Sequence, residues 1–168
     1  MVDTADPNDR TEEGNQYHLV PGKTYTKDPT VWVEEGSEPS YIRMKVTISN
    51  YNELVDIFGD PFLPQNYVGG WDPATWVTTN EIVVDTDKNE ATYEFRYKDI
   101  YTATADNKDG DVDYDMLPAL FTTINFPGES VNNAQLATLE GLQIKVVAHA
   151  IQAATFANAD AAWAAFAK

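Results

Sequence analysis

Three segments of the chain alternate apolar and polar side chains and predict the strongest β-strands, at residues 41–48, 91–98 and 142–151. This period of two is typical of a strand with one buried face. The side chains predicted to face the interior are Ile42, Met44, Val46, Ile48, Tyr93, Phe95, Tyr97, Leu142, Ile144, Val146 and Ala148. Those between them, including Arg43, Lys45 and His149, are predicted to face outward.

Weaker apolar patterns predict further strands at residues 30–33, 82–85, 100–103 and 120–126. Short helices are predicted at residues 52–58, 133–139 and 158–167. In the last helix Asn158 is a candidate N-cap, and Trp163 and Phe166 have the i, i+3 spacing needed to dock on a sheet. Many short strands without a βαβ rhythm favour a mainly β, antiparallel β-sandwich with small helical additions.

The length of 168 residues suits one domain, which we place at residues 17–168. Residues 1–16 carry almost no large apolar side chains and are predicted to form a flexible polar N-terminal arm. Because the chain has no cysteine, disulfides and thiolate zinc sites are excluded.

The formal net charge of −16 narrows the choice of partners. A charge of this sign repels phosphate backbones and anionic lipid, so we expect no nucleic-acid partner. No apolar run reaches the roughly 20 residues needed to span a bilayer, so we expect no membrane span.

The residues offer little support for catalysis, and we predict that the protein is not an enzyme. His18 and His149 lie far apart in sequence, and His149 is interpreted as a surface side chain. The Val68–Trp71 stretch lacks the spacing and the lysine of a phosphate-binding loop, and there is no serine elbow.

Asp109, Asp111 and Asp113 in the acidic segment 106–115 are weak candidates for a calcium site. The segment is not an EF-hand, because Ala105 and Met116 would occupy its first and last positions. A solvated loop is the favoured alternative. Calcium is the one cofactor considered, and none is expected.

Two other sets of residues allow specialised roles. Trp32, Trp71 and Trp76 suit either a carbohydrate-binding platform or a sandwich core with aromatic edges, and the core is favoured. Some extracellular fibres join a lysine to an asparagine by an isopeptide bond. The candidates here are Lys27, Lys45, Lys145, Asn50 and Asn125, although ordinary surface positions are favoured for each.

The order of three stretches resembles a known family. The first runs from Pro21 to Val46 and includes Glu35-Gly-Ser37, and the second is Leu117-Pro-Ala-Leu-Phe121 leading to Pro127. The third is Leu139 to Gln152, closed by Asp160-Ala-Ala-Trp163. Together they resemble the TasA/camelysin-like proteins of Gram-positive bacteria, which mature through the SipW-type signal peptidase. The BsaA-type biofilm-matrix subset is the most similar.

The resemblance implies a jelly-roll-like β-sandwich, secretion to the extracellular matrix or cell surface, and polymerisation into fibres or pilus-like filaments. It also implies self-association by donor-strand complementation, with other matrix proteins as further partners. Family members begin with an apolar donor strand, which Met1–Asn15 does not contain, so we expect that strand to lie outside this chain. The alternative function is a stand-alone cell-surface adhesin or carbohydrate-binding module.

Overall fold

The computed structural model describes residues 20–104, 114–129 and 131–166. Its strands are β1 (Thr24–Thr26), β2 (Trp32–Glu34), β3 (Ser40–Ser49), β4 (Val68–Gly69), β5 (Trp76–Asp85), β6 (Glu90–Tyr97), β7 (Tyr114–Met116), β8 (Thr123–Asn125) and β9 (Ile144–Gln152). Its α-helices are α1 (Tyr51–Phe58), α2 (Asn133–Thr138) and α3 (Ala159–Phe166). Single 3₁₀ turns occupy Pro64–Asn66 and Ala153–Thr155.

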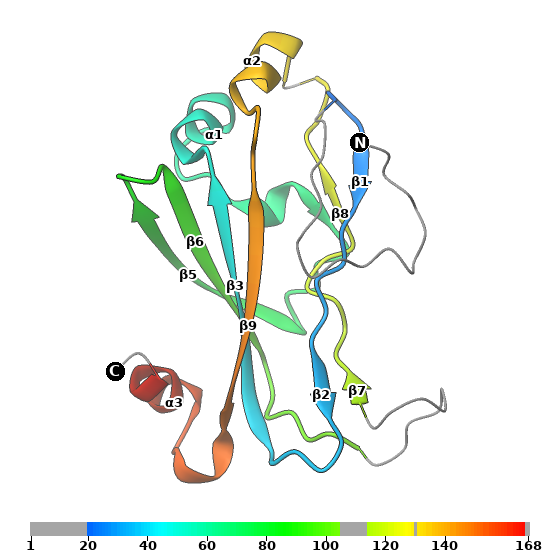
Figure 1. Ribbon diagram of the computed structural model, residues 1–168, viewed down its shortest axis with the longest axis vertical. Helices are drawn as coiled ribbons and strands as arrows, with labels where there is room; N and C mark the ends of the chain where they lie inside the picture. The colour runs from blue at the N-terminus through cyan, green and yellow to red at the C-terminus, as the bar shows by residue number, and fades with distance from the viewer. Residues whose placement is uncertain (1–19, 105–113, 130, 167–168) are drawn as a thin grey trace.

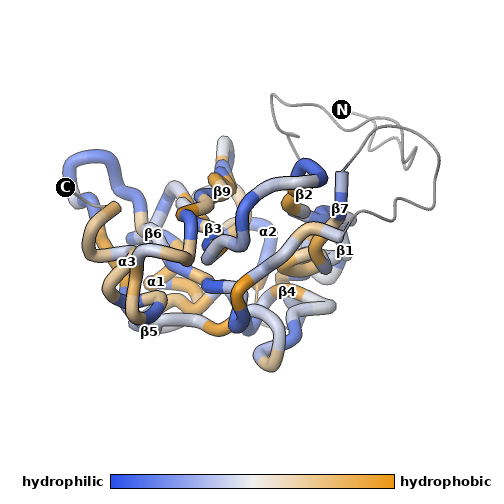
Figure 2. Tube along the Cα trace, turned by 90° about the horizontal axis from the view of Figure 1, so that it is seen from below, coloured by the Kyte–Doolittle hydropathy of each residue, from blue (hydrophilic) through white to orange (hydrophobic). Residues whose placement is uncertain are grey.

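The strands form two layers. One layer is a four-stranded antiparallel sheet in the order β5-β6-β3-β9. The other contains the three-stranded sheet β1-β8-β4 and the two-stranded ribbon β2-β7. Seen along the strands, β9, β3, β6 and β5 lie on one side and β1, β2, β4 and β7 on the other (Figure 2). The predicted mainly β, antiparallel β-sandwich with short flanking helices and a C-terminal helix is confirmed.

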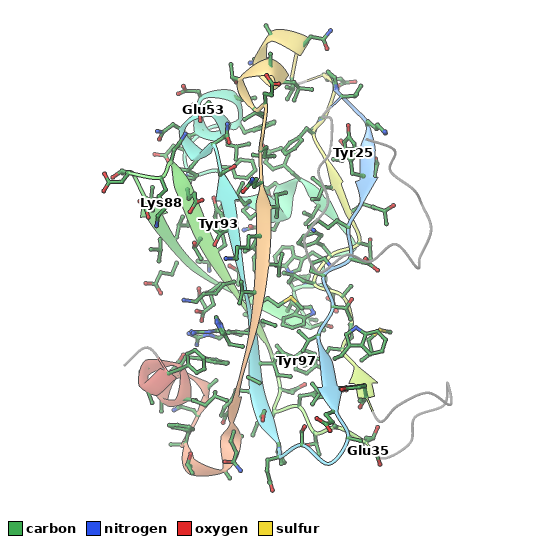
Figure 3. All side chains as sticks on the ribbon, in the orientation of Figure 1. Tyr25, Glu35, Glu53, Lys88, Tyr93 and Tyr97 are labelled. Atoms are coloured by element: carbon green, nitrogen blue, oxygen red, sulfur yellow. The ribbon has the colours of Figure 1, made fainter. Side chains whose placement is uncertain are left out.

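The core lies between the layers. The inward side chains of β3, from Ile42 to Ile48, are 1–3% exposed. Tyr93 and Phe95 of β6 join them, and the Tyr93 hydroxyl donates a 2.6 Å hydrogen bond to the Phe62 carbonyl. Tyr93 and Tyr97 lie among the packed side chains, whereas Lys88 lies at the tip of the β5–β6 hairpin (Figure 3). The alternating pattern therefore identified the buried face of both strands.

The helices cover the ends and the outer side of the four-stranded sheet. α1 and α2 lie at one end of the sandwich and α3 at the other (Figure 1). Asn158 caps α3, because its side-chain oxygen accepts a 2.9 Å hydrogen bond from the Ala161 N–H. Trp163 is 3% exposed, which confirms that α3 docks on the sheet.

Several boundaries differ from the prediction. Residues 100–103 form no strand; Tyr101 makes an isolated bridge to Ser40. The region 120–126 contains only the three residues of β8 as strand. The short strands β1, β4 and β7 were not predicted, because three residues or fewer cannot establish an alternating pattern.

The Val68–Trp71 stretch begins with the two residues of β4, and its small residues allow a close approach to the neighbouring segment. A Cβ at Gly69 would lie 2.5 Å from the Thr123 Oγ1 atom, and Gly70 has a φ of +79°. The two glycines therefore serve the packing of the three-stranded sheet.

Candidate functional site: the open edge of β9

β9 is an edge strand of the four-stranded sheet. Among the described residues it pairs with β3 alone, through nine register pairs from Ser40↔Gln152 to Ile48↔Ile144. The register has no break. An unpaired strand edge presents backbone N–H and C=O groups to any extended chain that reaches it.

The hydrogen bonds at the two ends of this ladder show which groups of β9 face the open side. The Ser49 N–H donates to the Gln143 carbonyl at 3.1 Å, and the Ala153 N–H donates to the Pro39 carbonyl at 2.8 Å. Because antiparallel ladders alternate, odd-numbered residues between these ends bond to β3. The N–H and C=O groups of Val146, Ala148 and Ala150 therefore point toward the open edge.

The same even-numbered residues have side chains on the inner face of the sheet. Ala148 and Ala150 are exposed, although their partners on β3, Met44 and Ile42, are each 1% exposed. The prediction that Ala148 is buried is therefore wrong. Its side chain does face inward, but the opposite layer does not cover this half of β9.

An apolar slot lies between the layers at the other half of β9. Its lining is Val46, Ile48, Phe62, Pro64, Tyr67, Val68, Phe121, Ile124, Phe126, Leu142 and Ile144. The slot has room for only about 20 Å³, which is little more than one water molecule needs. An added strand would therefore extend the sheet beside β9 and cover the slot from the edge, rather than enter it.

The outer face of β3 and β9 is more enclosed than the sequence suggested. Arg43 does face outward, but it is only 5% exposed because α3 lies over it. Its guanidinium carbon lies 4.3 Å from the centre of the Trp163 ring and 5.0 Å from that of Phe166. Glu94 accepts a 2.9 Å bond from Arg43 and a 2.6 Å bond from Arg96. The cation–π contacts of Arg43 and the ion pair between Arg96 and Asp160 of α3 thus fix α3 to the sheet, and Glu94 holds the two arginines in place.

His149 belongs to this cluster and is half-buried, in contrast to the surface histidine that was predicted. Its ring lies 5.0 Å from Phe166, and its Nδ1 atom accepts a 3.4 Å hydrogen bond from the Arg43 Nε–H. Burial, together with the nearby positive charges of Arg43 and Lys45, lowers the pKa of His149 below its usual value. The neutral imidazole is therefore favoured in the folded protein.

The crosslink candidates are spread over different parts of the fold. Lys45 and Lys145 lie on the outer face of the four-stranded sheet, whereas Asn125 lies on β8 in the other layer and donates to Thr24 at 2.8 Å. Asn50 donates to the Thr138 carbonyl at 3.3 Å. Burial lowers the pKa of Lys27, which follows β1. Neither asparagine amide donates to a lysine in these bonds, so the geometry lends the crosslink no support.

The three tryptophans do not form one exposed platform. Trp76 is 0% exposed and donates its indole N–H to the Pro118 carbonyl at 2.9 Å. Trp71 is half-buried and donates to the Trp76 carbonyl, also at 2.9 Å. Trp32, on β2, is 50% exposed. The core interpretation holds for Trp76, and a platform built from all three is excluded.

The remaining candidates fall outside the part of the chain that the structure describes. These are His18 and the calcium candidates Asp109, Asp111 and Asp113. Within residues 20–104, 114–129 and 131–166, no group of three or more His, Cys, Asp or Glu side chains is arranged to hold a metal ion. Over the same residues no helix has the length and apolar character needed to cross a membrane.

Comparison of the chain with protein-family models, with curated proteins and with solved structures returned no match. What the site can do must therefore be argued from its geometry. Alternation alone had located the strand that forms it, but not its position at the edge. The small size of the inward residues Ala148 and Ala150 is a feature of the sequence at this edge, but the alternating pattern had placed Ala148 in the core.

Proposed function

We propose that the protein is a structural subunit of an extracellular biofilm-matrix fibre, which self-assembles when one subunit donates a β-strand to the edge of the next. The observation that carries this proposal is the open edge of β9. Its outward backbone groups and uncovered inner face occur together at Ala148 and Ala150. A strand added here would form hydrogen bonds with these backbone groups and would cover the exposed inner face.

The sequence resemblance to the TasA/camelysin-like proteins points in the same direction and supplies the biological setting. In that setting the chain is secreted, its principal partner is a further copy of itself, and other matrix proteins can join the fibre. Its large negative charge then keeps free subunits soluble at high concentration.

Strand donation would also explain why the slot beside β9 is narrow. A donated strand needs only the ladder of hydrogen bonds along β9 and shallow contacts with the two alanines. The main chain then supplies affinity, and the alternate side chains that face the interior supply specificity.

The test is to extend the chain at its N-terminus with an apolar donor strand of the kind that the resemblance implies. Electron microscopy should show filaments of the extended chain, whereas the 168-residue chain should stay monomeric or weakly associated. An extended, folded chain that never forms filaments would rule out strand donation.

A further inference from the structure

Two adjoining hollows lie on the outer face of the four-stranded sheet, and the first of them borders α3. They have volumes of about 320 Å³ and 330 Å³, and both are lined by Val83 and Thr92. We call them together the outer trough. The lining residues that matter below are Lys45, Val83, Arg96, Lys145 and Trp163. Val83 is 58% exposed, the most of any large apolar side chain in the described residues.

The outer trough differs in charge from the rest of the protein. Five of the 11 basic residues line it: Arg43, Lys45, Lys88, Arg96 and Lys145. Five of the 27 acidic residues line it as well: Glu81, Asp85, Glu90, Glu94 and Asp160. Its formal charge is therefore zero, and the whole net charge of −16 lies elsewhere. The trough is thus a region of the surface that an acidic partner can approach without net repulsion.

Two of the five cations are available to a partner. Arg43, Arg96 and Lys88 are already paired with Glu94, Asp160 and Asp85. Lys45 and Lys145 form no ion pair with any described residue. Lys45 lies opposite Val147, and Lys145 lies opposite Thr47. The two lysines are therefore diagonal neighbours on one face of adjacent strands, where long side chains can reach the same group.

The same trough contains a hydrogen-bond donor that lacks an acceptor. The Trp163 side chain is 3% exposed, and its indole N–H is buried without a partner among the described residues. A buried, unpaired donor is costly and rare in folded proteins. Because this N–H is itself buried, a partner in the trough does not reach it. An incoming carboxylate would instead supply negative charge to Lys45 and Lys145.

The chain itself contains a segment with the complementary chemistry. Residues 106–113 carry four aspartates, Asp106, Asp109, Asp111 and Asp113, and one lysine. The described residues on either side of this segment are Thr104 and Tyr114, and Tyr114 opens β7 in the other layer. α3 and β7 lie on opposite sides of the molecule (Figure 1). Tyr114, where the described chain resumes after this segment, therefore lies on the opposite side of the subunit from α3, which borders the trough.

We propose that the outer trough binds the acidic segment 106–113 of a second copy of the chain. The two surfaces differ, so the contact is heterologous and can repeat from copy to copy without closing. This inference deepens the proposed fibre function and rests on it, since it names a second contact that operates alongside strand donation. Alone, the contact is a weak, salt-sensitive association, because surface ion pairs contribute little individually.

The test reverses the charge of each surface in the 168-residue chain. One variant, with Lys45→Glu and Lys145→Glu, carries a reversed trough. The other, with Asp109→Lys, Asp111→Lys and Asp113→Lys, carries a reversed segment. In each variant alone, residues 45 and 145 and the segment carry charge of the same sign. In an equimolar mixture, residues 45 and 145 of each variant meet a segment of opposite charge on the other variant, so the two variants should alternate.

Sedimentation velocity at about 0.15 M salt is the readout, because net repulsion is then screened beyond roughly 8 Å. The average mass of the wild-type chain should rise with concentration. Each variant should associate at least about tenfold more weakly, and the mixture should recover wild-type behaviour. A monomeric wild-type chain, a variant that associates as the wild type does, or a mixture without recovery would each overturn the inference.

Matched controls separate this contact from net charge and from folding. Lys23→Glu with Lys98→Glu changes the net charge as the trough variant does, at exposed sites outside the trough. The control for the segment variant carries Glu38→Lys, Glu129→Lys and Glu140→Lys, which change the net charge by the same amount at exposed sites. Both controls should associate as the wild type does. The thermal midpoint of each variant, compared with that of the wild type, shows whether the variant is folded.

The two experiments distinguish a failure of the trough contact from a failure of strand donation. If the extended chain forms filaments but the charge-swapped mixture does not recover association, only the trough contact is wrong. If the mixture recovers association but the extended chain never forms filaments, only strand donation is wrong.

Discussion

The two edges of the four-stranded sheet, β9 and β5, are both apolar in part, yet their backbones differ. β9 pairs with β3 over nine residues without a break, whereas the pairing of β5 with β6 shifts between Thr78 and Ile82. At that shift Asn80 takes a left-handed φ of 59°. β5 exposes Val77, Val83 and Val84, and β9 exposes Val147. Exposed apolar area therefore does not distinguish the edges.

What distinguishes them is whether the edge can template another strand. A bulge bends and twists a strand, and proteins use bulges to prevent unwanted pairing at sheet edges. β5 is interrupted in this way and β9 is not. The regular pairing of β9 with β3, together with the uncovered Ala148 and Ala150, therefore marks β9 as the edge open to a partner.

The largest effect is expected from Ala148→Pro. The Ala148 N–H points away from β3, so proline removes a group that a donated strand would use and leaves the β3 ladder intact. Filament growth of the extended chain should fall roughly tenfold or more, as scored by electron microscopy and light scattering.

The matched control is Ala148→Thr, which keeps the N–H and suits a strand. It should form filaments nearly as well as the wild type. Filaments of normal length and yield from a folded Ala148→Pro chain would show that β9 does not receive the strand.

The next largest effect is expected from deleting Asn80 and Glu81, which removes the two extra residues of the β5 bulge. β5 would then pair regularly along its length and become a second templating edge. We expect the deletion variant to associate more strongly than the wild-type 168-residue chain in size-exclusion chromatography. A folded deletion variant that associates only as strongly as the wild type would show that the bulge does not protect this edge.

A smaller effect concerns His149, which lies on β9 beneath α3. Because its pKa is lowered in the folded state, its contribution to stability is present above the unfolded pKa of about 6.5. That contribution is lost as the pH falls from about 6.5 toward the folded pKa. The urea midpoint should drop over this window, before the carboxylates titrate.

The variant His149→Gln keeps a polar side chain without titrating in this range. Its urea midpoint should be flat across the same pH window. An identical pH dependence in His149→Gln and wild type would assign the effect to other groups.

The smallest effect is expected from Val84→Pro on the other edge. Val84 lies opposite Ala91, whose backbone groups bond to β3 by the alternation described above, so the Val84 N–H points to the open side of β5. This proline is the β5 counterpart of Ala148→Pro. Filament yield should stay within about twofold of the wild type, and a loss as large as that of Ala148→Pro would mean that both edges assemble.

Much of the fold was predictable because strands with one buried face carry a period of two. That pattern located β3, β6 and β9 to within two residues at either end. It failed for β1, β4 and β7, which are too short, and for residues 100–103, where β-forming side chains make only one bridge. The candidate site was predictable only in part, because a single strand's pattern does not reveal how many neighbours it has.

The sequence by itself determined that this is an acidic, cysteine-free, mainly β chain, and which face of its main strands is buried. Side-chain polarity and spacing decide those properties locally. Only the tertiary structure decided that β9 lies at an edge, that Ala148 is uncovered and that Arg43 is buried beneath α3. The physical reason is that pairing and burial depend on segments far apart in the chain, such as β3 and α3, which alternation along one strand cannot report.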